Sequence, residues 1–130
     1  MFKLQNKVEL IVPKEDNNGQ EIADKRIKEY VNSVTMQAGG CTITEVKGQW
    51  WSDDEQRIMQ DNNLNLEWYY AVEDAKFMTV ELKGIVRRLI EVYGQEAVSI
   101  KVNGTLYIVD SSDIEELHTT LLKLMTEEVK

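Results

Sequence analysis

The sequence contains very few of the residues from which nucleophilic and metal sites are built. Its 130 residues include one histidine, one cysteine and one proline, which are His118, Cys41 and Pro13. A lone cysteine excludes an internal disulfide, and one cysteine with one histidine cannot supply the four ligands of a closed zinc site. A catalytic triad or a Cys–His pair would have to use His118, which falls on an amphipathic helical pattern. We therefore expect no metal and no cofactor, and binding rather than catalysis.

Long apolar runs and an excess of basic residues are missing too. No apolar stretch approaches membrane-spanning length, and residues 1–7 contain no apolar signal core. Asp and Glu number 23 against 15 Lys and Arg, which gives a formal net charge of −8. Such a surface is repelled by the phosphates of nucleic acids and by anionic lipids. The sequence predicts a cytoplasmic protein that binds neither duplex nucleic acid nor a membrane.

Glycine-rich phosphate cradles are also lacking, because Gly39-Gly40 precedes a strand and Gly104 belongs to a hairpin. The densest basic group combines Lys83 with Arg87 and Arg88, and it is typical of a solvated helix face. The acidic residues are scattered, which favours a solvating surface and leaves an acidic docking face as the alternative. Helix capping is the simplest explanation of one further acidic group, which consists of Asp110, Asp113, Glu115 and Glu116.

Hydrophobic periodicity divides the chain into eight elements within one domain, residues 1–130. Strand patterns alternate with a period of two, and helical patterns repeat apolar residues at every third or fourth position. Residues 52–63 favour a polar loop with room for a short helical turn at 55–60. The predicted strands are residues 8–12, 41–51, 64–72, 97–102 and 105–109, and the predicted helices are residues 20–38, 79–93 and 112–129.

The order β-α-β-β-α-β-β-α predicts an α+β protein. Its first six elements match a ferredoxin-like fold, in which helices cover one face of an antiparallel sheet. The dipeptide Asn103-Gly104 predicts that a C-terminal hairpin strand extends the sheet, followed by a helix. We expect Thr79 to cap the second helix, and Ser112 with Glu115 to form a capping box for the third.

Three short motifs resemble landmarks of a known family. They are Gly40-Cys41-Thr42, Gly48-Gln49-Trp50 and the run Tyr93-Gly94-Gln95-Glu96-Ala97-Val98. Together they are similar to a small uncharacterised bacterial ferredoxin-like domain family over roughly residues 8–102. The resemblance implies a fold and no chemistry, so it assigns no functional residue.

Aromatic side chains gather in the middle of the chain, at Trp50-Trp51 and at Trp68-Tyr69-Tyr70. Neighbouring residues of a strand point to opposite faces of the sheet, so the two adjacent indoles cannot both enter the core. At least one should meet a second molecule, which would be another copy of the chain, another protein or a small planar ligand. Ordinary packing beneath the third helix is the remaining alternative. The candidate ligand or interface residues are Gln49, Trp50, Trp51, Arg57, Glu67, Trp68 and Tyr70.

These features leave three classes of function open. The first is a non-catalytic acidic interaction protein, such as an inhibitor from a phage or mobile element that acts on a host protein. The second is a small-molecule binder that holds a nucleotide-like ring in an aromatic pocket on the sheet. The third is a small enzyme with a carboxylate acid or base such as Asp61, Glu67 or Glu73. We expect the chain to associate with itself, as a homodimer, or with another protein.

Overall fold

Five antiparallel strands form one sheet in the order β2-β3-β1-β4-β5. The computed structural model describes residues 1–127, and its first six long elements follow the β-α-β-β-α-β order of a ferredoxin-like α+β fold. The predicted fold class is confirmed, including the hairpin strand and the helix that extend the unit at its C-terminal end. The strands are β1 Asn6–Pro13, β2 Thr42–Ser52, β3 Arg57–Tyr70, β4 Ala97–Val102 and β5 Thr105–Asp110.

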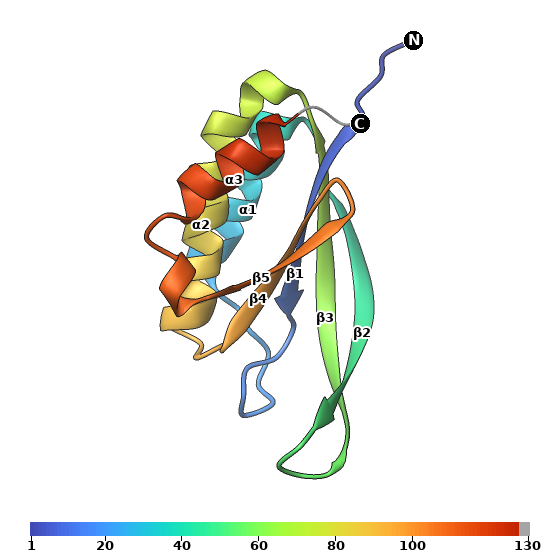
Figure 1. Cartoon of the computed structure of the whole chain (residues 1–130), viewed down its shortest axis with the longest axis vertical. Helices are drawn as coiled ribbons and strands as arrows, with labels where there is room; N and C mark the ends of the chain where they lie inside the picture. The colour runs from blue at the N-terminus through green and yellow to red at the C-terminus, as the bar shows by residue number, and fades with distance from the viewer. Residues whose placement is uncertain (128–130) are drawn as a thin grey trace.

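The α-helices of the described residues all lie on one face of the sheet, and the opposite face is bare (Figure 1). The second helix, α2, packs against both α1 and α3. Val129, predicted to end the apolar side of the third helix, lies outside the described residues. The helices are α1 Lys25–Ala38, α2 Ala75–Glu91 and α3 Leu117–Thr126, and two short 3-10 turns are η1 Val72–Asp74 and η2 Ser111–Asp113.

The core lies between the sheet and the helices. Alternate residues of β1 and β3 point toward the helices, so Val8 pairs with Trp68 and Leu10 with Leu66 on the buried face. The helical stripe predicted for α2 is confirmed as the side that packs on the sheet. Its fully buried members include Leu82, Ile85, Val86 and Leu89.

Trp68 and Tyr70 are completely buried on the inner face of β3, and both satisfy their polar atoms there. The indole Nε1 of Trp68 donates to Thr35 Oγ1 at 3.0 Å, and the Tyr70 hydroxyl donates to the Met125 carbonyl oxygen at 2.7 Å. Burial raises the pKa of Tyr70 to about 12. Since buried indole and phenol groups need a hydrogen-bond partner, these two bonds fix α1 and α3 against β3.

The first helix begins later than predicted, because Asp24 acts as its N-cap. The Asp24 carboxylate accepts from the backbone N–H of Ile27 at 2.9 Å, and the helix itself begins at Lys25. The Asp24 side chain is only 4% exposed. Arg88 Nη2 donates to it at 2.8 Å, and the Tyr93 hydroxyl donates at 2.5 Å. The carboxylate therefore ties the start of α1 to the end of α2.

Residues 52–63 form a hairpin and not the predicted loop. Only residues 53–56 turn, with Gln56 in the left-handed region at φ 53°, and β3 begins at Arg57. β1 pairs with β3 only from Asn63 onward, so residues 47–62 form a two-stranded ribbon beyond the rest of the sheet (Figure 1). We call this ribbon the arm. Its second half lacks the alternating apolar pattern of a strand because the helices cover neither face of the arm.

Two predicted helix starts are also wrong. α2 begins at Ala75, four residues before the expected cap, and Thr79 is buried inside it. The capping box near the third helix uses Asp110 and Asp113 of η2 and not Ser112 with Glu115. At η2 an aspartate takes the capping role that the pattern gave to a hydroxyl residue, since either side chain caps well. Asp74, the residue before α2, makes no side-chain capping hydrogen bond.

None of the helices in residues 1–127 combines the length and the apolar character needed to cross a bilayer.

The Asp24 contacts predict a specific loss of stability in acid. Hydrogen bonds from Arg88, with further ones from Tyr93 and the Ile27 N–H, hold the pKa of the Asp24 carboxyl well below its usual value of 3.8. The unfolded chain therefore takes up this proton more readily, so the contribution is complete above pH 3.8 and declines as the pH falls toward the lowered pKa. We expect Asp24→Asn to lower the free energy of unfolding at pH 7 by about 1–3 kcal/mol. When unfolding in urea is measured from pH 7 down to pH 2, the free energy of unfolding of Asp24→Asn should depend less on pH than that of the wild type. Asp54→Asn, on the exposed turn of the arm, is the control, and equal pH slopes for wild type and Asp24→Asn would contradict the assignment.

The burial of Trp68 predicts a strong contrast between the tryptophans. Trp68→Ala removes a fully buried side chain and should cost about 3–5 kcal/mol in urea unfolding. Trp50→Ala, at a position that is 50% exposed on the arm, should cost less than about 1 kcal/mol when measured in a dilute monomeric sample. Similar losses for both variants would show that the arm contributes to the core of a single subunit.

Candidate functional site

The seven candidate residues do not form one site within a single subunit. Trp68 and Tyr70 belong to the core. Glu67 lies on the bare face of the sheet, where its carboxylate is 3.6 Å from Lys7 Nζ. Gln49, Trp50, Trp51 and Arg57 are all on the arm.

Trp50 and Trp51 point to opposite faces of the arm, as the period of the strand requires. Trp50 pairs with Met59 and Trp51 with Ile58 in the β2–β3 register. Neither indole enters the core, because the arm extends past the end of the helices. Trp50 is 50% exposed and Trp51 is 52% exposed, and Ile58 beside it is equally open. The Trp51 Nε1 donates to Asp53 Oδ1 at 3.0 Å, which holds this ring near the turn.

The arm has free backbone on both sides. β2 is an edge strand along its whole length, and β3 pairs with no strand other than β2 between Arg57 and Asn62. Of these residues, Asn62 has a further backbone contact, because its carbonyl oxygen accepts from the Lys14 N–H at 3.0 Å. A hollow of about 620 Å³ lies on the arm and is lined by residues of both strands. One of them is Arg57, whose guanidinium is 3.4 Å from Glu55. The residues that line this hollow are Gln49, Arg57, Ile58, Met59 and Gln60.

A groove between the sheet and α1 is lined by aliphatic side chains and not by aromatic ones. It has a volume of about 600 Å³ and runs between the first turns of α1 and the inner faces of β1 and β3. Ile43 on β2 is 58% exposed beside it, because α1 does not reach over the edge strand. The main apolar residues that line this groove are Val12, Ile22, Ile27, Val31, Leu64 and Leu66.

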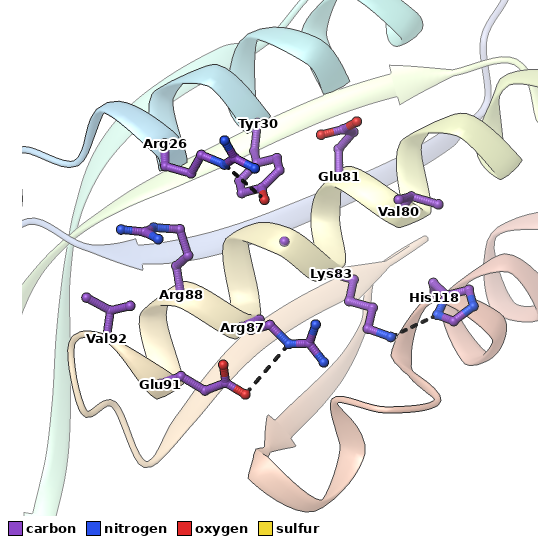
Figure 2. A pocket seen from close by; sticks show the side chains of 11 residues that line it. Arg26, Tyr30, Val80, Glu81, Lys83, Arg87, Arg88, Glu91, Val92 and His118 are labelled. Atoms are coloured by element: carbon purple, nitrogen blue, oxygen red, sulfur yellow. Dashed lines mark hydrogen bonds and ion pairs between the residues drawn. The ribbon is translucent and has the colours of Figure 1, made fainter.

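A third hollow, of about 650 Å³, lies on the outer side of the helices, and we call it the helix-face cleft. Figure 2 shows side chains from all three α-helices around it, with Tyr30 from α1 and His118 from α3 on either side of α2. Sequence reasoning recognised the basic group on α2 but assigned it to a solvated face. It missed Arg26, Tyr30 and His118, because only the packing of three helices brings them to the same place.

Gly84 allows the Tyr30 ring to form the floor of the helix-face cleft. A Cβ at this position would lie 2.7 Å from Tyr30 Cζ, so any side chain would displace the ring. Glycine in the middle of a helix costs roughly 1 kcal/mol relative to alanine. This unfavourable residue in the middle of α2 was the one signal in the sequence that marked a close approach to the helix.

The basic groups of the helix-face cleft have different partners. Arg88 is occupied by the Asp24 carboxylate. Lys83 Nζ donates to the Glu115 carbonyl oxygen at 2.9 Å and is 3.2 Å from His118 Nδ1, so both of its contacts are to uncharged acceptors when the imidazole is neutral. Arg87 Nε lies 3.6 Å from Glu91 Oε1, which is longer than a hydrogen bond. Arg26 Nε donates to the Tyr30 hydroxyl at 3.3 Å.

The residues expected to matter for catalysis are not gathered in one place. Asp61 is on the arm, Glu67 is on the bare face of the sheet and Glu73 is in η1. Burial raises the pKa of the Cys41 thiol, which disfavours the reactive thiolate. Within residues 1–127 no three His, Cys, Asp or Glu side chains are grouped so as to hold a metal ion.

Comparison with known proteins gives similarity of fold alone. No protein-family model matches the sequence, and no curated protein matches it. A phage SAM lyase in complex with S-methyl-5'-thioadenosine has a TM-score of 0.56 at 13% identity, over 86% of this chain and 96% of that one. A phage SAM lyase in the apo state has a TM-score of 0.51 at 14% identity, over 85% and 95%.

CutA from Archaeoglobus fulgidus, described as a periplasmic divalent cation tolerance protein, has a TM-score of 0.45 at 8% identity, over 89% of this chain and 97% of that one. The chain therefore has an α+β, ferredoxin-like fold that it shares with a phage SAM lyase over most of the length of both proteins.

Proposed function

We propose that this protein is a homo-oligomer that binds a nucleoside-like small molecule. The arm contacts both the ligand and a second copy of the chain. The observation that carries the proposal is the exposure of Trp50 and Trp51 on opposite faces of a ribbon with two free edges. Of the three classes of function that the sequence left open, binding of a small planar ligand has the most support.

The arm needs a partner for physical reasons. An isolated two-stranded ribbon is marginally stable in water, and unpaired edges promote association with other strands. Large apolar groups on both faces add to this tendency, since water is excluded only if something covers them. A second copy of the chain is the partner we infer, because β5, the other edge strand, exposes Leu106 and Ile108 on the bare face of the same sheet. Both apolar surfaces would be covered in one contact.

The chemistry of the arm suits a planar ring with polar edges. An exposed indole offers a flat surface on which a base can stack, and each such stack is worth about 1–3 kcal/mol. The Gln49 amide has both a donor and an acceptor for the edge of a base, and the Arg57 guanidinium can stack or donate. The shared fold supports this ligand class, since the structure of the similar phage SAM lyase is a complex with S-methyl-5'-thioadenosine.

The other two classes have weaker support. If the chain were an acidic interaction protein, the arm would also be covered, but by a host protein and not by a second copy of the chain. An enzyme would need its acid or base close to the ligand, and of the candidate carboxylates only Asp61 is on the arm. Mass spectrometry of SAM after incubation with the protein would separate binding from turnover.

The ligand proposal predicts quenching of tryptophan fluorescence by S-methyl-5'-thioadenosine. Stacking on Trp50 or Trp51 should change the emission and raise the melting temperature, by an amount that grows with ligand concentration. Trp50→Leu or Trp51→Leu should weaken binding by about 5- to 150-fold, the equivalent of one lost stack. Phe77→Leu, an exposed aromatic on α2, is the matched control and should bind like wild type. The absence of any response to this compound, to adenosine and to SAM would rule out the proposal.

The oligomer proposal predicts that disruption of the arm produces monomers. We expect a mass of at least two chains by light scattering at micromolar concentrations. Trp51→Ser with Ile58→Ser should shift the population to the monomer of 15.0 kDa without unfolding it, because both side chains are half-exposed. Phe77→Ser serves as the control. A wild-type protein that stays monomeric at all concentrations would contradict the proposal and favour a different partner for the arm.

A further inference from the structure

The helix-face cleft concentrates positive charge in a protein that is otherwise strongly acidic. Arg26, Lys83, Arg87 and Arg88 line it, whereas only two carboxylates do, and the formal net charge of the whole chain is −8. Arg88 is neutralised by Asp24, as described above. The remaining basic groups face a hollow large enough for a small ligand, and their side chains are drawn in Figure 2.

Lys83 and Arg87 are arranged unfavourably unless an anion joins them. They lie four residues apart on α2, so their side chains share one face of the helix, and like charges at this spacing destabilise it by a few tenths of a kcal/mol. Within the described part of the chain, Lys83 has no carboxylate within 4.0 Å. The Nε of Arg87 is buried and has no hydrogen-bond partner there. The Arg87 side chain as a whole is 43% exposed, so its guanidinium is open to a ligand although its Nε is not.

His118 completes a group of three donors drawn from two helices. Its Nδ1 is 3.2 Å from Lys83 Nζ, an ammonium that can only donate, so Nδ1 accepts and a neutral ring carries its proton on Nε2. The same contact holds the lysine toward α3, where the Glu115 carbonyl also fixes it. The ammonium has three N–H bonds and two protein acceptors, which leaves one donor for a ligand.

We propose that the helix-face cleft binds a phosphate-type oxyanion, contacted by Lys83, Arg87 and His118. A tetrahedral oxyanion accepts from ammonium and guanidinium groups at once, and such charge-assisted bonds are about twice as strong as neutral ones. The Tyr30 ring on the floor and Val80 on the rim offer apolar surface to an organic group attached to the anion. This site lies on the outer side of the helices and is independent of the ligand proposed for the arm.

Calorimetric titration of the full chain tests the proposal with three probes at constant ionic strength. Inorganic phosphate tests the oxyanion alone, adenosine 5'-monophosphate tests a phosphate ester, and adenosine lacks the charged group. We expect Arg87→Gln to raise the Kd of the phosphate-bearing probes at least tenfold and to leave adenosine unaffected. Lys76→Gln removes the same charge from α2 away from the cleft and should change the Kd less than twofold.

Arg87 is the decisive position, because its only described contact is the long ion pair with Glu91 and its variant should fold normally. Lys83→Gln is the second variant, checked by circular dichroism since it also loosens the contact with α3. Binding of inorganic phosphate would show that the oxyanion alone is sufficient for binding to the cleft. Binding of adenosine 5'-monophosphate without binding of inorganic phosphate would show that the attached organic group is needed as well. The proposal is overturned if neither probe binds, or if Lys76→Gln weakens binding as much as Arg87→Gln does. Neither result would bear on the arm, which is tested with phosphate-free nucleosides and tryptophan variants.

Discussion

β3 runs for 14 residues, but β1 pairs with only its last eight, Asn63–Tyr70. This mismatch in strand length determines most of what distinguishes the molecule. Where β1 and the helices are present, the inner face of β3 is fully buried and carries Trp68 and Tyr70. Where they are absent, the same strand continues as one side of an arm with no layer above or below it. The change from core to arm occurs within a single strand, so the sheet continues beyond the hydrophobic core.

Two contacts position α1 against α2. Asp24 caps α1 and accepts from Arg88 and Tyr93 at the end of α2. Toward the middle of α2, Gly84 leaves room for the Tyr30 ring. The first contact sets where α1 crosses α2, and the second allows the two helices to approach closely. The floor of the helix-face cleft is a consequence of both, so the same residues that stabilise the fold also shape this hollow.

Patterns of buried residues made most of the fold predictable. The stripe on α2, the alternation in β1 and the Asn103-Gly104 turn all reflect local chemistry, and each lies where it was expected. The first strand of the arm was predicted, but its second strand was taken for a loop, because a ribbon exposed on both faces has no reason to alternate apolar and polar residues. The cleft was missed for a different reason. Arg26, Lys83 and His118 are far apart in sequence, and periodicity within one helix says nothing about which side chains from other helices will face it.

Trp50 and Trp51 point to opposite faces of the ribbon, as the pleat of a strand requires, but neither ring enters the core. An indole in the core must also bury its N–H against an acceptor, as Trp68 does with Thr35. Trp51 instead uses Asp53 on the exposed turn, next to Asp54 and Glu55. This acidic turn repels the phosphates of nucleotides but not an uncharged nucleoside, whereas the helix-face cleft has the opposite charge. The charge distribution therefore favours a division in which the arm receives neutral planar rings and the cleft receives anions. For a ligand that has both a planar ring and a phosphate, the charge on the phosphate would determine which of the two sites binds it more tightly.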